Sequence, residues 1–302
     1  MEMKLLNTFI AVADHCGFSR AAERTGFVQS SVSTQIRLLE EELGVRLFER
    51  LGRRIHLTGE GERLLPYAKK IVALEQEARD LLSNADAPGG TLRIGASETL
   101  CISYLPSVLK EYRERYPGVA LILRLGNVSE LRGWVADNEI DIAFVIDREM
   151  VSEALSVEVL FDEAILLLAS PEKKINGKSP VRPGDLDGED LILTDSGSYR
   201  MVLENILAGE GVRPASVMES GSIEAIKKLV VSGLGVTLLP RAVVLEELRS
   251  GQLADLGWGG PAFGIKSQMV RHKDKWFSPA LRAMVDMARS HAPRGDSAPA
   301  AP

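Results

Sequence analysis

The chain has 302 residues, of which 45% are hydrophobic and 26% are charged. This is an ordinary globular composition, and it excludes a wholly disordered chain, a collagen-like fibre and a bare coiled coil. The formal net charge of −6 argues against non-specific coating of nucleic acid, but it allows a small DNA-reading module beside an acidic domain.

Few features point to a membrane, a metal or an oxidising compartment. The two cysteines, Cys16 and Cys101, cannot form a disulfide framework or a four-cysteine zinc site. The histidines are scattered without metal-ligand spacing, so we expect neither a metal nor another cofactor. No apolar run is long enough to cross a membrane, and Asp14, His15 and Arg20 interrupt the N-terminus before a signal peptide could form. We therefore expect a cytoplasmic protein that does not contact membranes.

Residues 1–58 are predicted to form helices joined by short turns. Apolar residues recur at helical spacing up to Gly17, and Ser19 can cap a second helix over residues 20–25. A third helix is predicted from about Gln29 to Leu43. A short helix, a glycine turn and a longer helix are typical of a helix-turn-helix.

The third predicted helix has one polar and one apolar side. At 100° per residue, an arc of about 140° holds Gln29, Ser30, Ser33, Thr34 and Arg37, and an arc of about 60° holds Val32, Ile36, Leu39 and Leu43. The polar groups can bond to base edges and phosphates in a major groove. However, any surface helix is polar on its outer side, so both interpretations stay open for this helix alone.

The next segment favours the DNA-binding interpretation. Arg50, Arg53 and Arg54 surround Gly52 and precede a short β-prone run up to Thr58. Arginines on such a hairpin are typical of a basic wing that grips phosphate. The sequence therefore predicts a winged helix-turn-helix over residues 1–58.

Residues 59–87 are predicted to form one long linker helix. Its apolar seam has three-and-four spacing through Leu64, Tyr67, Ile71, Leu74, Ala78, Leu81 and Ala85. Three heptads of this kind are typical of a dimerisation helix. The alternative is a helix that packs on its own domain. Residues 88–90 are expected to act as a hinge.

Residues 91–292 are predicted to form an α/β domain. Strands over 91–95, 119–125 and 140–145 alternate with helices over 99–116 and 129–137, which indicates a mostly parallel sheet. A strand over 160–169 is expected to cross to a second lobe, with strands near 191–193, 216–218 and 236–239. A strand over 263–270 is expected to return, closed by a helix over 279–289. The first lobe then covers about 91–161 and 268–292, the second lobe covers about 162–267, and the tail over 293–302 is expected to be disordered.

Motifs along nearly the whole chain resemble the LysR-type transcriptional regulators. In the N-terminal part these are Phe9, Ala21-Ala22-Glu23-Arg24, Gln29, Val32-Ser33, Gln35-Ile36, Leu39-Glu40, Leu43-Gly44, Leu47-Phe48-Glu49-Arg50, Leu57-Thr58 and Gly61. Further on they are Leu92-Arg93-Ile94-Gly95, Tyr116-Pro117, Asp141-Ile142-Ala143, Gly233-Leu234-Gly235 and Leu239-Pro240. The resemblance implies a winged helix-turn-helix dominated by α-helices, followed by an effector domain of two Rossmann-like α/β lobes like those of periplasmic binding proteins.

The resemblance also implies a function. Members of this family are dimeric or tetrameric regulators that are not enzymes, bind a partly palindromic site on double-stranded DNA upstream of a promoter, and act there with RNA polymerase. A small molecule bound between the two lobes changes how the DNA is bent and contacted.

The resemblance assigns DNA contacts to particular residues. Its recognition-helix positions fall on Gln29, Ser30, Ser33, Thr34 and Arg37, and its wing contacts fall on Arg50, Arg53 and Arg54. The family often has serine at position 28, proline at 30 and arginine at 34, where this chain has Val28, Ser30 and Thr34. Val28 cannot cap the helix with its side chain, so another group must satisfy the first amides.

The effector positions implied by the resemblance follow two predicted strands. They are Ser97 and Thr99 after the first strand, and Ser196, Ser198, Tyr199 and Arg200 across the cleft. Helix N-termini favour anions and Arg200 can clamp a carboxylate, so we expect a small organic acid. Glu98 argues against an anion unless it points away. The alternatives are that Ser97, Thr99 and Ser196 are plain helix caps and that Arg200 pairs with a neighbouring acid.

Other functions have weaker support. A solute-binding protein needs a signal peptide and leaves the first 87 residues unexplained. An enzyme with a Rossmann-like lobe needs a nucleotide or nucleophile motif, and Gly233-Leu234-Gly235 is too short for a dinucleotide loop. Cys101 is expected to be a buried structural residue, with a redox switch as the alternative.

Overall fold

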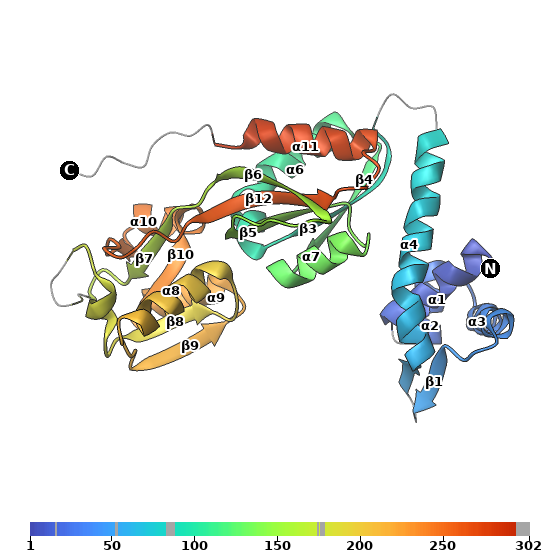
Figure 1. The fold of residues 1–302 in the computed structure, drawn as a ribbon, viewed down its shortest axis with the longest axis horizontal. Coiled ribbons are helices and arrows are strands. Elements are labelled where there is room, and N and C mark those ends of the chain that lie inside the picture. The colour runs from blue at the N-terminus through green and yellow to red at the C-terminus, as the bar shows by residue number, and fades with distance from the viewer. Residues whose placement is uncertain (16, 52–53, 83–87, 174, 176–178, 294–302) are drawn as a thin grey trace. The chain divides into compact units, whose positions relative to one another are not determined.

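The computed structural model describes residues 1–15, 17–51, 54–82, 88–173, 175 and 179–293. The chain divides into two compact units, of which the first covers residues 1–85 and the second covers most of the rest (Figure 1). Among the described residues, no helix combines the length and the apolar character that a membrane span requires.

The first unit is a winged helix-turn-helix, as predicted. It contains α1 (Met3–His15), α2 (Phe18–Thr25), α3 (Gln29–Leu43), an antiparallel hairpin of β1 (Phe48–Leu51) and β2 (Arg54–Leu57), and α4 (Gly59–Leu82). All these helices contribute to one apolar core, in which the Phe48 ring lies 5.4 Å from the Phe9 ring and 6.0 Å from the Phe18 ring, measured between centroids. The core therefore joins the wing to the helices.

The start of α2 differs from the prediction. The helix begins at Phe18 with Gly17 as its N-cap, so the predicted cap at Ser19 is wrong. Phe18 packs against Phe48 in the core, and this contact favours a helix that includes Phe18. The Ser19 hydroxyl instead donates to Oε1 of Gln29 at 3.2 Å, which links α2 to the start of α3.

Hydrogen bonds fix the wing to the helices on both sides. Oε1 of Glu40 on α3 accepts from the backbone N–H groups of Leu47 and Phe48, at 2.7 and 3.2 Å. The Thr58 hydroxyl accepts from the Gly61 N–H at 3.1 Å and so caps α4. A Cβ atom at Gly61 would lie 2.3 Å from the Leu47 carbonyl oxygen, so only glycine fits at this position. Glu40, Thr58 and Gly61 are among the residues that carry the resemblance to the LysR family. These contacts show the structural role of each of them.

The long helix α4 has both a packed and an exposed side. Ala68 and Ala73 are buried, and Ala68 belongs to the core of the first unit. On the predicted seam, Tyr67 is 66% exposed and Leu74 is 59% exposed. Ala85, the last residue of the predicted seam, lies outside the described residues. Helix α4 therefore packs on its own unit and still leaves large apolar side chains uncovered.

The first lobe of the second unit is built on a five-stranded mixed sheet. The strand order is β4 (Val119–Leu125), β3 (Gly90–Ala96), β5 (Ile142–Arg148), β12 (Ile265–His272) and β6 (Leu155–Asp162). Strand β3 is parallel to β4 and β5, whereas β12 is antiparallel to β5 and β6. Helices α6 (Leu105–Arg115) and α11 (Pro279–His291) cover one face of the sheet, and α7 (Val128–Ala136) covers the other (Figure 1).

The helix predicted over residues 99–116 is two helices. Helix α5 (Glu98–Ser103) ends at Tyr104, and α6 starts at Leu105 with Pro106 in its first turn. Proline lacks an N–H group and restricts the residue before it, so the backbone bends here. The Tyr104 hydroxyl donates to the carbonyl oxygen of Ala288 and thereby ties the bend to α11.

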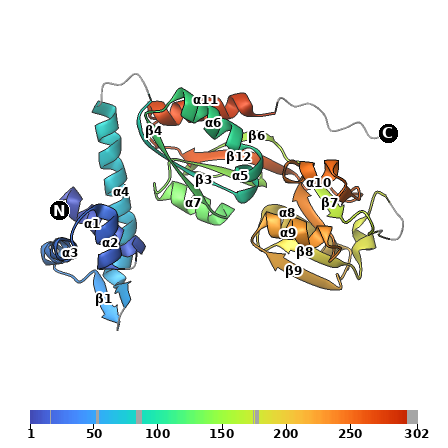
Figure 2. The same cartoon turned by 180° about the vertical axis from the view of Figure 1, so that it is seen from behind.

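The second lobe contains two small sheets. One has the order β10 (Thr237–Pro240), β7 (Ile165–Ala169) and β11 (Ala254–Asp255), and the other pairs β8 (Asp190–Thr194) with β9 (Ser216–Ser220) in parallel. The helices are α8 (Ser198–Gly209), α9 (Ile223–Val231) and α10 (Leu245–Arg249), with short 3-10 turns η1 (Pro183–Leu186) and η2 (Arg241–Val243). Helices α8 and α9 lie beside the β8–β9 pair (Figure 2).

Two chain segments connect the lobes. The strand predicted over residues 160–169 is divided into β6 in the first lobe and β7 in the second, because the polar Asp162 and Glu163 interrupt the apolar run. The N–H of Glu163 donates to the Ile265 carbonyl oxygen at 2.9 Å, and the Ser267 hydroxyl donates to the Glu163 carboxylate. The outgoing and returning segments are therefore bonded to each other at the crossing.

Candidate functional site

The polar side of α3 is exposed. Gln29, Ser30, Thr34 and Arg37 are exposed and Ser33 is half-buried, whereas Val32, Ile36 and Leu39 are buried. Leu43 was assigned to the apolar stripe, but it is 37% exposed. Gln35, which is outside the predicted apolar stripe, is buried instead, and its amide oxygen accepts from the buried Thr8 hydroxyl. The predicted recognition surface is thus available on the first unit.

The first turn of α3 has no side-chain cap. Val28 is the N-cap residue, with φ −81° and ψ 149°, and α3 begins at Gln29 as predicted. No side chain accepts a hydrogen bond from the first amides of α3. Free N–H groups at a helix N-terminus can bind a phosphate oxygen. The departure from the family serine therefore leaves the first amides of α3 without a side-chain cap from position 28.

Two of the three predicted wing arginines lie in the strands of the hairpin. Arg50 is in β1 and Arg54 is in β2, where Arg54 pairs with Leu51. Arg53 lies outside the described residues. The hairpin backbone thus places two of the three predicted phosphate contacts on neighbouring strands.

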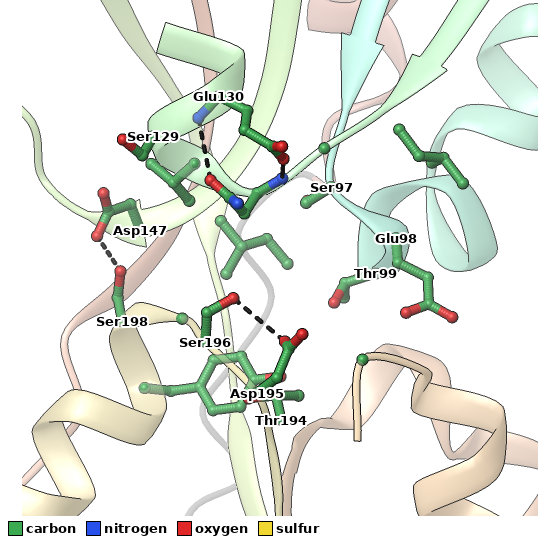
Figure 3. Close-up of a pocket in the computed structure, with 18 of the residues that line it drawn as sticks. Ser97, Glu98, Thr99, Ser129, Glu130, Asp147, Thr194, Asp195, Ser196 and Ser198 are labelled. Carbon is green, nitrogen blue, oxygen red and sulfur yellow. Dashed lines mark hydrogen bonds between the residues drawn. The ribbon is translucent and has the colours of Figure 1, made fainter. Parts of the chain in front are cut away.

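A cavity of about 910 Å³ separates the two lobes of the second unit (Figure 3). It is lined by Ser97, Glu98, Thr99, Leu125, Gly126, Asn127, Val128, Ser129, Glu130, Arg132, Ile146, Asp147, Thr194, Asp195, Ser196, Gly197, Ser198, Tyr199, Met201, Gly221 and Ile223. These residues follow or end the parallel strands β3, β4 and β5 of one lobe and β8 and β9 of the other. Ligands of open α/β sheets bind at this end of the strands.

Five of the six predicted effector residues line this cavity: Ser97, Thr99, Ser196, Ser198 and Tyr199. Ser97 is the N-cap residue of α5 but its side chain makes no capping hydrogen bond, and the N-cap of α8 is Gly197 rather than Ser196. Oγ of Ser97 is buried without a hydrogen-bond partner, and Thr99 is 5% exposed with no partner for its hydroxyl among the described residues. The Thr99 hydroxyl is therefore free to bond to a ligand in the cavity, whereas Oγ of Ser97 is closed off in this structure.

Arg200 does not line the cavity. Its guanidinium donates to the Thr194 carbonyl oxygen at 2.6 Å, to Glu204 at 2.8 Å and to Glu219. These contacts connect α8 with β8 and β9 and hold all three nitrogens of the guanidinium. The alternative interpretation from the sequence, in which Arg200 pairs with neighbouring acids, is the one that the structure shows.

Carboxylates that were not among the predicted effector residues also line the cavity. The Asp147 carboxylate accepts from the Ser198 hydroxyl across the cavity (Figure 3). The Glu98 carboxylate accepts from the Ile223 N–H at 3.2 and 3.3 Å. Glu130 and Asn127 cap the start of α7 reciprocally, at 2.9 and 3.0 Å. Ligands of open α/β sheets bind at the carboxyl ends of the strands. Applied to the second and third predicted strands, this rule would have identified Asn127 and Asp147 as cavity residues.

Gln268 on β12 supports the loop that carries Asp147. Its fully buried amide donates to the carbonyl oxygens of Asp147 and Arg148, at 3.2 and 3.0 Å, and accepts from the Met150 N–H at 3.1 Å. Strand β12 thus fixes the part of the cavity wall that carries Asp147, although the two segments are far apart in the sequence.

The cavity has a negative electrostatic environment. Burial and, to a smaller extent, the nearby charge of Glu98 raise the pKa of Cys101 to about 11. Burial also raises the pKa of Tyr199 to about 12, with added contributions from Glu98 and Asp195. The Cys101 thiol is therefore protonated at neutral pH, which argues against the redox role left open by the sequence. Within the described residues, no group of three or more His, Cys, Asp or Glu side chains is placed to hold a metal ion.

Two family models match this chain and together cover nearly all of it. The model for the bacterial regulatory helix-turn-helix protein of the lysR family matches residues 3–62, and the LysR substrate binding domain matches residues 85–293.

Related proteins and structures agree with this assignment. The chain is 39% identical to YwqM, an uncharacterized HTH-type transcriptional regulator of Bacillus subtilis strain 168, over 96% of this chain and 99% of that protein. It is 32% identical to the HTH-type transcriptional regulator GltR of the same strain, over 96% and 97%. The fold matches full-length OxyR of Pseudomonas aeruginosa with a TM-score of 0.74, at 23% identity over 98% and 99% of the two chains. It also matches CbnR in complex with its target DNA, with a TM-score of 0.68 at 23% identity over 97% and 100%. The chain belongs to the LysR family of DNA-binding transcriptional regulators.

Proposed function

We propose that the protein binds a promoter operator through α3 and the wing, and that a small organic acid in the interlobe cavity controls its action on transcription by RNA polymerase. The observation that carries this proposal is the combination of an exposed polar side on α3 with a cavity at the strand ends of a separate unit. The proposed DNA contacts are Gln29, Ser30, Ser33, Thr34, Arg37, Arg50, Arg53 and Arg54, and the proposed effector contacts are Ser97, Thr99, Ser196, Ser198 and Tyr199.

An acid group has a suitable place in the cavity. No side chain caps the N-terminus of α8, and Ser198 and Tyr199 at this terminus line the cavity. Uncapped N–H groups at the positive end of a helix favour a carboxylate. The free hydroxyl of Thr99 can add a hydrogen bond from the other lobe.

The proposal also includes self-association through α4. Tyr67 and Leu74 expose large apolar areas at heptad spacing, and a second copy of the same helix would cover them. Two recognition helices held at a fixed separation match a partly palindromic operator. We expect a homodimer, or a tetramer assembled from two such dimers.

A DNA-binding measurement tests the proposed function. The full chain and its Gln29→Ala variant are titrated against the DNA upstream of the protein's own gene and against random DNA, with fluorescence anisotropy as the readout. Loss of the Gln29 amide should cost about 1–3 kcal/mol at the cognate site and relax the base preference, because its bonds to base edges discriminate sequence.

The matched control is Asn7→Ala, which removes an exposed amide from α1. It should leave the affinity unchanged. An equal loss on cognate and random DNA would contradict base recognition by Gln29. Absence of specific binding to that DNA and to every neighbouring promoter fragment would contradict the proposed function itself.

A further inference from the structure

The charge of the cavity wall does not match a ligand that is only an anion. Four carboxylates line the cavity, from Glu98, Glu130, Asp147 and Asp195, against one guanidinium from Arg132. The raised pKa values of Tyr199 and Cys101 are partly due to this negative charge. A simple acid would therefore meet net repulsion over most of the wall.

The four carboxylates differ in what they bind. Glu98 and Asp147 are held by donors of the opposite lobe, Ile223 N–H and the Ser198 hydroxyl. Glu130 caps α7. The Asp195 carboxylate accepts only from the hydroxyl of the adjacent Ser196 among the hydrogen bonds of the described residues, and it is exposed to the cavity (Figure 3). Asp195 is therefore the carboxylate most available to a ligand.

An uncommitted hydroxyl faces this acidic wall. Thr99 is nine-tenths buried, its hydroxyl has no partner among the described residues, and it points into the cavity opposite Asp195 (Figure 3). A ligand in the cavity can therefore supply the hydrogen-bond partner that this side chain lacks.

From these observations we infer that the effector carries a positively charged nitrogen, which lies against the Asp195 side of the cavity. The inference rests on the proposed function and narrows its ligand class. Together with an acid group at the start of α8, it describes an amino acid or a similar zwitterion. A charge-assisted hydrogen bond from an ammonium group to a carboxylate is about twice as strong as a neutral one, so the amino group contributes both affinity and orientation.

Matched compound pairs test this inference on the full chain. Thermal unfolding is followed with the twenty common amino acids, with 2-hydroxy acids that replace the amino group (lactate for alanine, malate for aspartate), and with diamines of two to five carbons. We expect at least one amine-bearing compound to raise the melting temperature at a concentration about tenfold below that of its hydroxy counterpart.

The outcomes separate the two proposals. Stabilisation by an amino acid supports both the organic acid of the proposed function and the cationic nitrogen inferred here. Stabilisation by a diamine alone supports the cationic nitrogen but contradicts the organic acid. A hydroxy acid that stabilises as well as its amino counterpart overturns the inference and leaves the organic acid intact. Stabilisation by no amine-bearing compound also overturns the inference.

Asp195→Asn supplies a second test, with Glu210→Gln as its control. Glu210 is an exposed carboxylate at the opposite end of α8, so its change removes the same charge outside the cavity. Asp195→Asn should weaken binding of the stabilising amine about tenfold or more, and Glu210→Gln should not.

Without ligand, Asp195→Asn should raise the melting temperature relative to Glu210→Gln, because one of several repelling charges is removed. A lower melting temperature would show that Asp195 serves the structure, and it would overturn the inference. Unchanged binding of the amine by the Asp195→Asn variant would also overturn the inference.

Discussion

Single residues decide how each site of this protein differs from the family pattern. On the DNA side, Val28 leaves the first amides of α3 without a side-chain acceptor. On the effector side, Thr99 keeps a free hydroxyl facing the cavity, while Arg200 is committed to Glu204, Glu219 and the Thr194 carbonyl oxygen. The unbonded groups, more than the bonded ones, indicate where DNA and ligand are expected to bind.

Val28→Ser should stabilise the first turn of α3. Val28 is 66% exposed and already has the extended backbone of an N-cap residue, so serine can accept from a first-turn amide with little loss of burial. We expect a gain of about 1 kcal/mol, or about fivefold slower amide exchange in this turn, measured by hydrogen–deuterium exchange of the full chain. Val28→Ala, which has no acceptor, should give no such protection. Equal protection in both variants would show that capping is not the cause.

Thr99→Val should remove the effector response while DNA affinity stays normal. The change keeps the side-chain volume and removes a hydroxyl that has no partner in the protein, so the fold loses no hydrogen bond. Binding of the stabilising compound should weaken by about tenfold, measured by calorimetry. The matched control is Thr237→Val, which removes a buried unpartnered hydroxyl from β10 outside the cavity. If Thr99→Val binds normally, Thr99 does not contact the effector.

At the scale of elements, two carboxyl groups hold strands and helices together with opposite pH dependences. Glu158 on β6 accepts two hydrogen bonds from Arg289 on α11, at 2.7 and 2.8 Å, and these bonds lower the pKa of Glu158. Glu163 lies where the chain crosses between the lobes, and its burial raises its pKa, although the Ser267 hydrogen bond acts in the other direction. The first group stabilises the fold when charged, and the second when neutral.

Glu158→Gln should destabilise the second unit at pH 7 by about 0.5–1 kcal/mol, since the pair is partly exposed and screened. A lowered carboxyl pKa contributes stability above the unfolded-state value near 4.5, and this contribution is lost as the pH falls through the lower folded-state value. The difference in melting temperature between variant and wild type should therefore disappear in acid. Glu114→Gln, on the exposed surface of α6, is the control. A difference that persists in strong acid would exclude the ionised pair as its source.

Glu163→Gln should have the opposite effect. A raised carboxyl pKa means that the folded state loses stability as the pH rises above the unfolded value near 4.5. Glutamine is neutral and still accepts from Ser267, so the variant should melt about 2–4 °C higher at neutral pH, or about 1 kcal/mol. The melting temperatures of the variant and the wild type should become equal when the pH is below the unfolded-state pKa of the Glu163 carboxyl group. A lower melting temperature at pH 7 would show that the charge of Glu163 stabilises the crossing.

At the scale of the whole molecule, the proposed regulation needs two copies of the chain and two separate units. The first unit carries the recognition helix and the exposed seam of α4, and the second unit carries the cavity. A chain of 24 helical residues in α4 extends about 36 Å, which is long enough to pair with a second copy over several turns. Self-association is therefore the property on which palindromic recognition depends.

Leu74→Glu should convert the dimer to a monomer. The change places a carboxylate in the middle of an apolar seam, and an unpaired buried charge costs about 3 kcal/mol or more per interface. Sedimentation velocity over a range of concentrations should show the shift, together with loss of high-affinity binding to a two-half-site operator. Glu62→Lys, at an exposed position of α4 away from the seam, should remain dimeric. A dimeric Leu74→Glu protein would place the interface elsewhere.

The local pattern of residues in the sequence was sufficient to predict most helices and strands and to identify the family. Helical spacing, glycine breaks and the strand–helix alternation predicted most helices and strands, because burial periodicity and backbone freedom are properties of neighbouring residues. The same local signals failed where a distant contact decides the outcome. Helix α2 starts at Phe18, which packs against Phe48, and the start of α6 is tied to α11 through Tyr104.

Only the tertiary structure decided the chemistry of the cavity. Asp147 reaches its wall because Gln268, far along the chain, fixes the end of β5. Arg200 was expected to meet a ligand, but Glu219 from a neighbouring strand takes its guanidinium. Charge balance in a cavity depends on which side chains from separate segments come together, and no local pattern in the sequence contains that information.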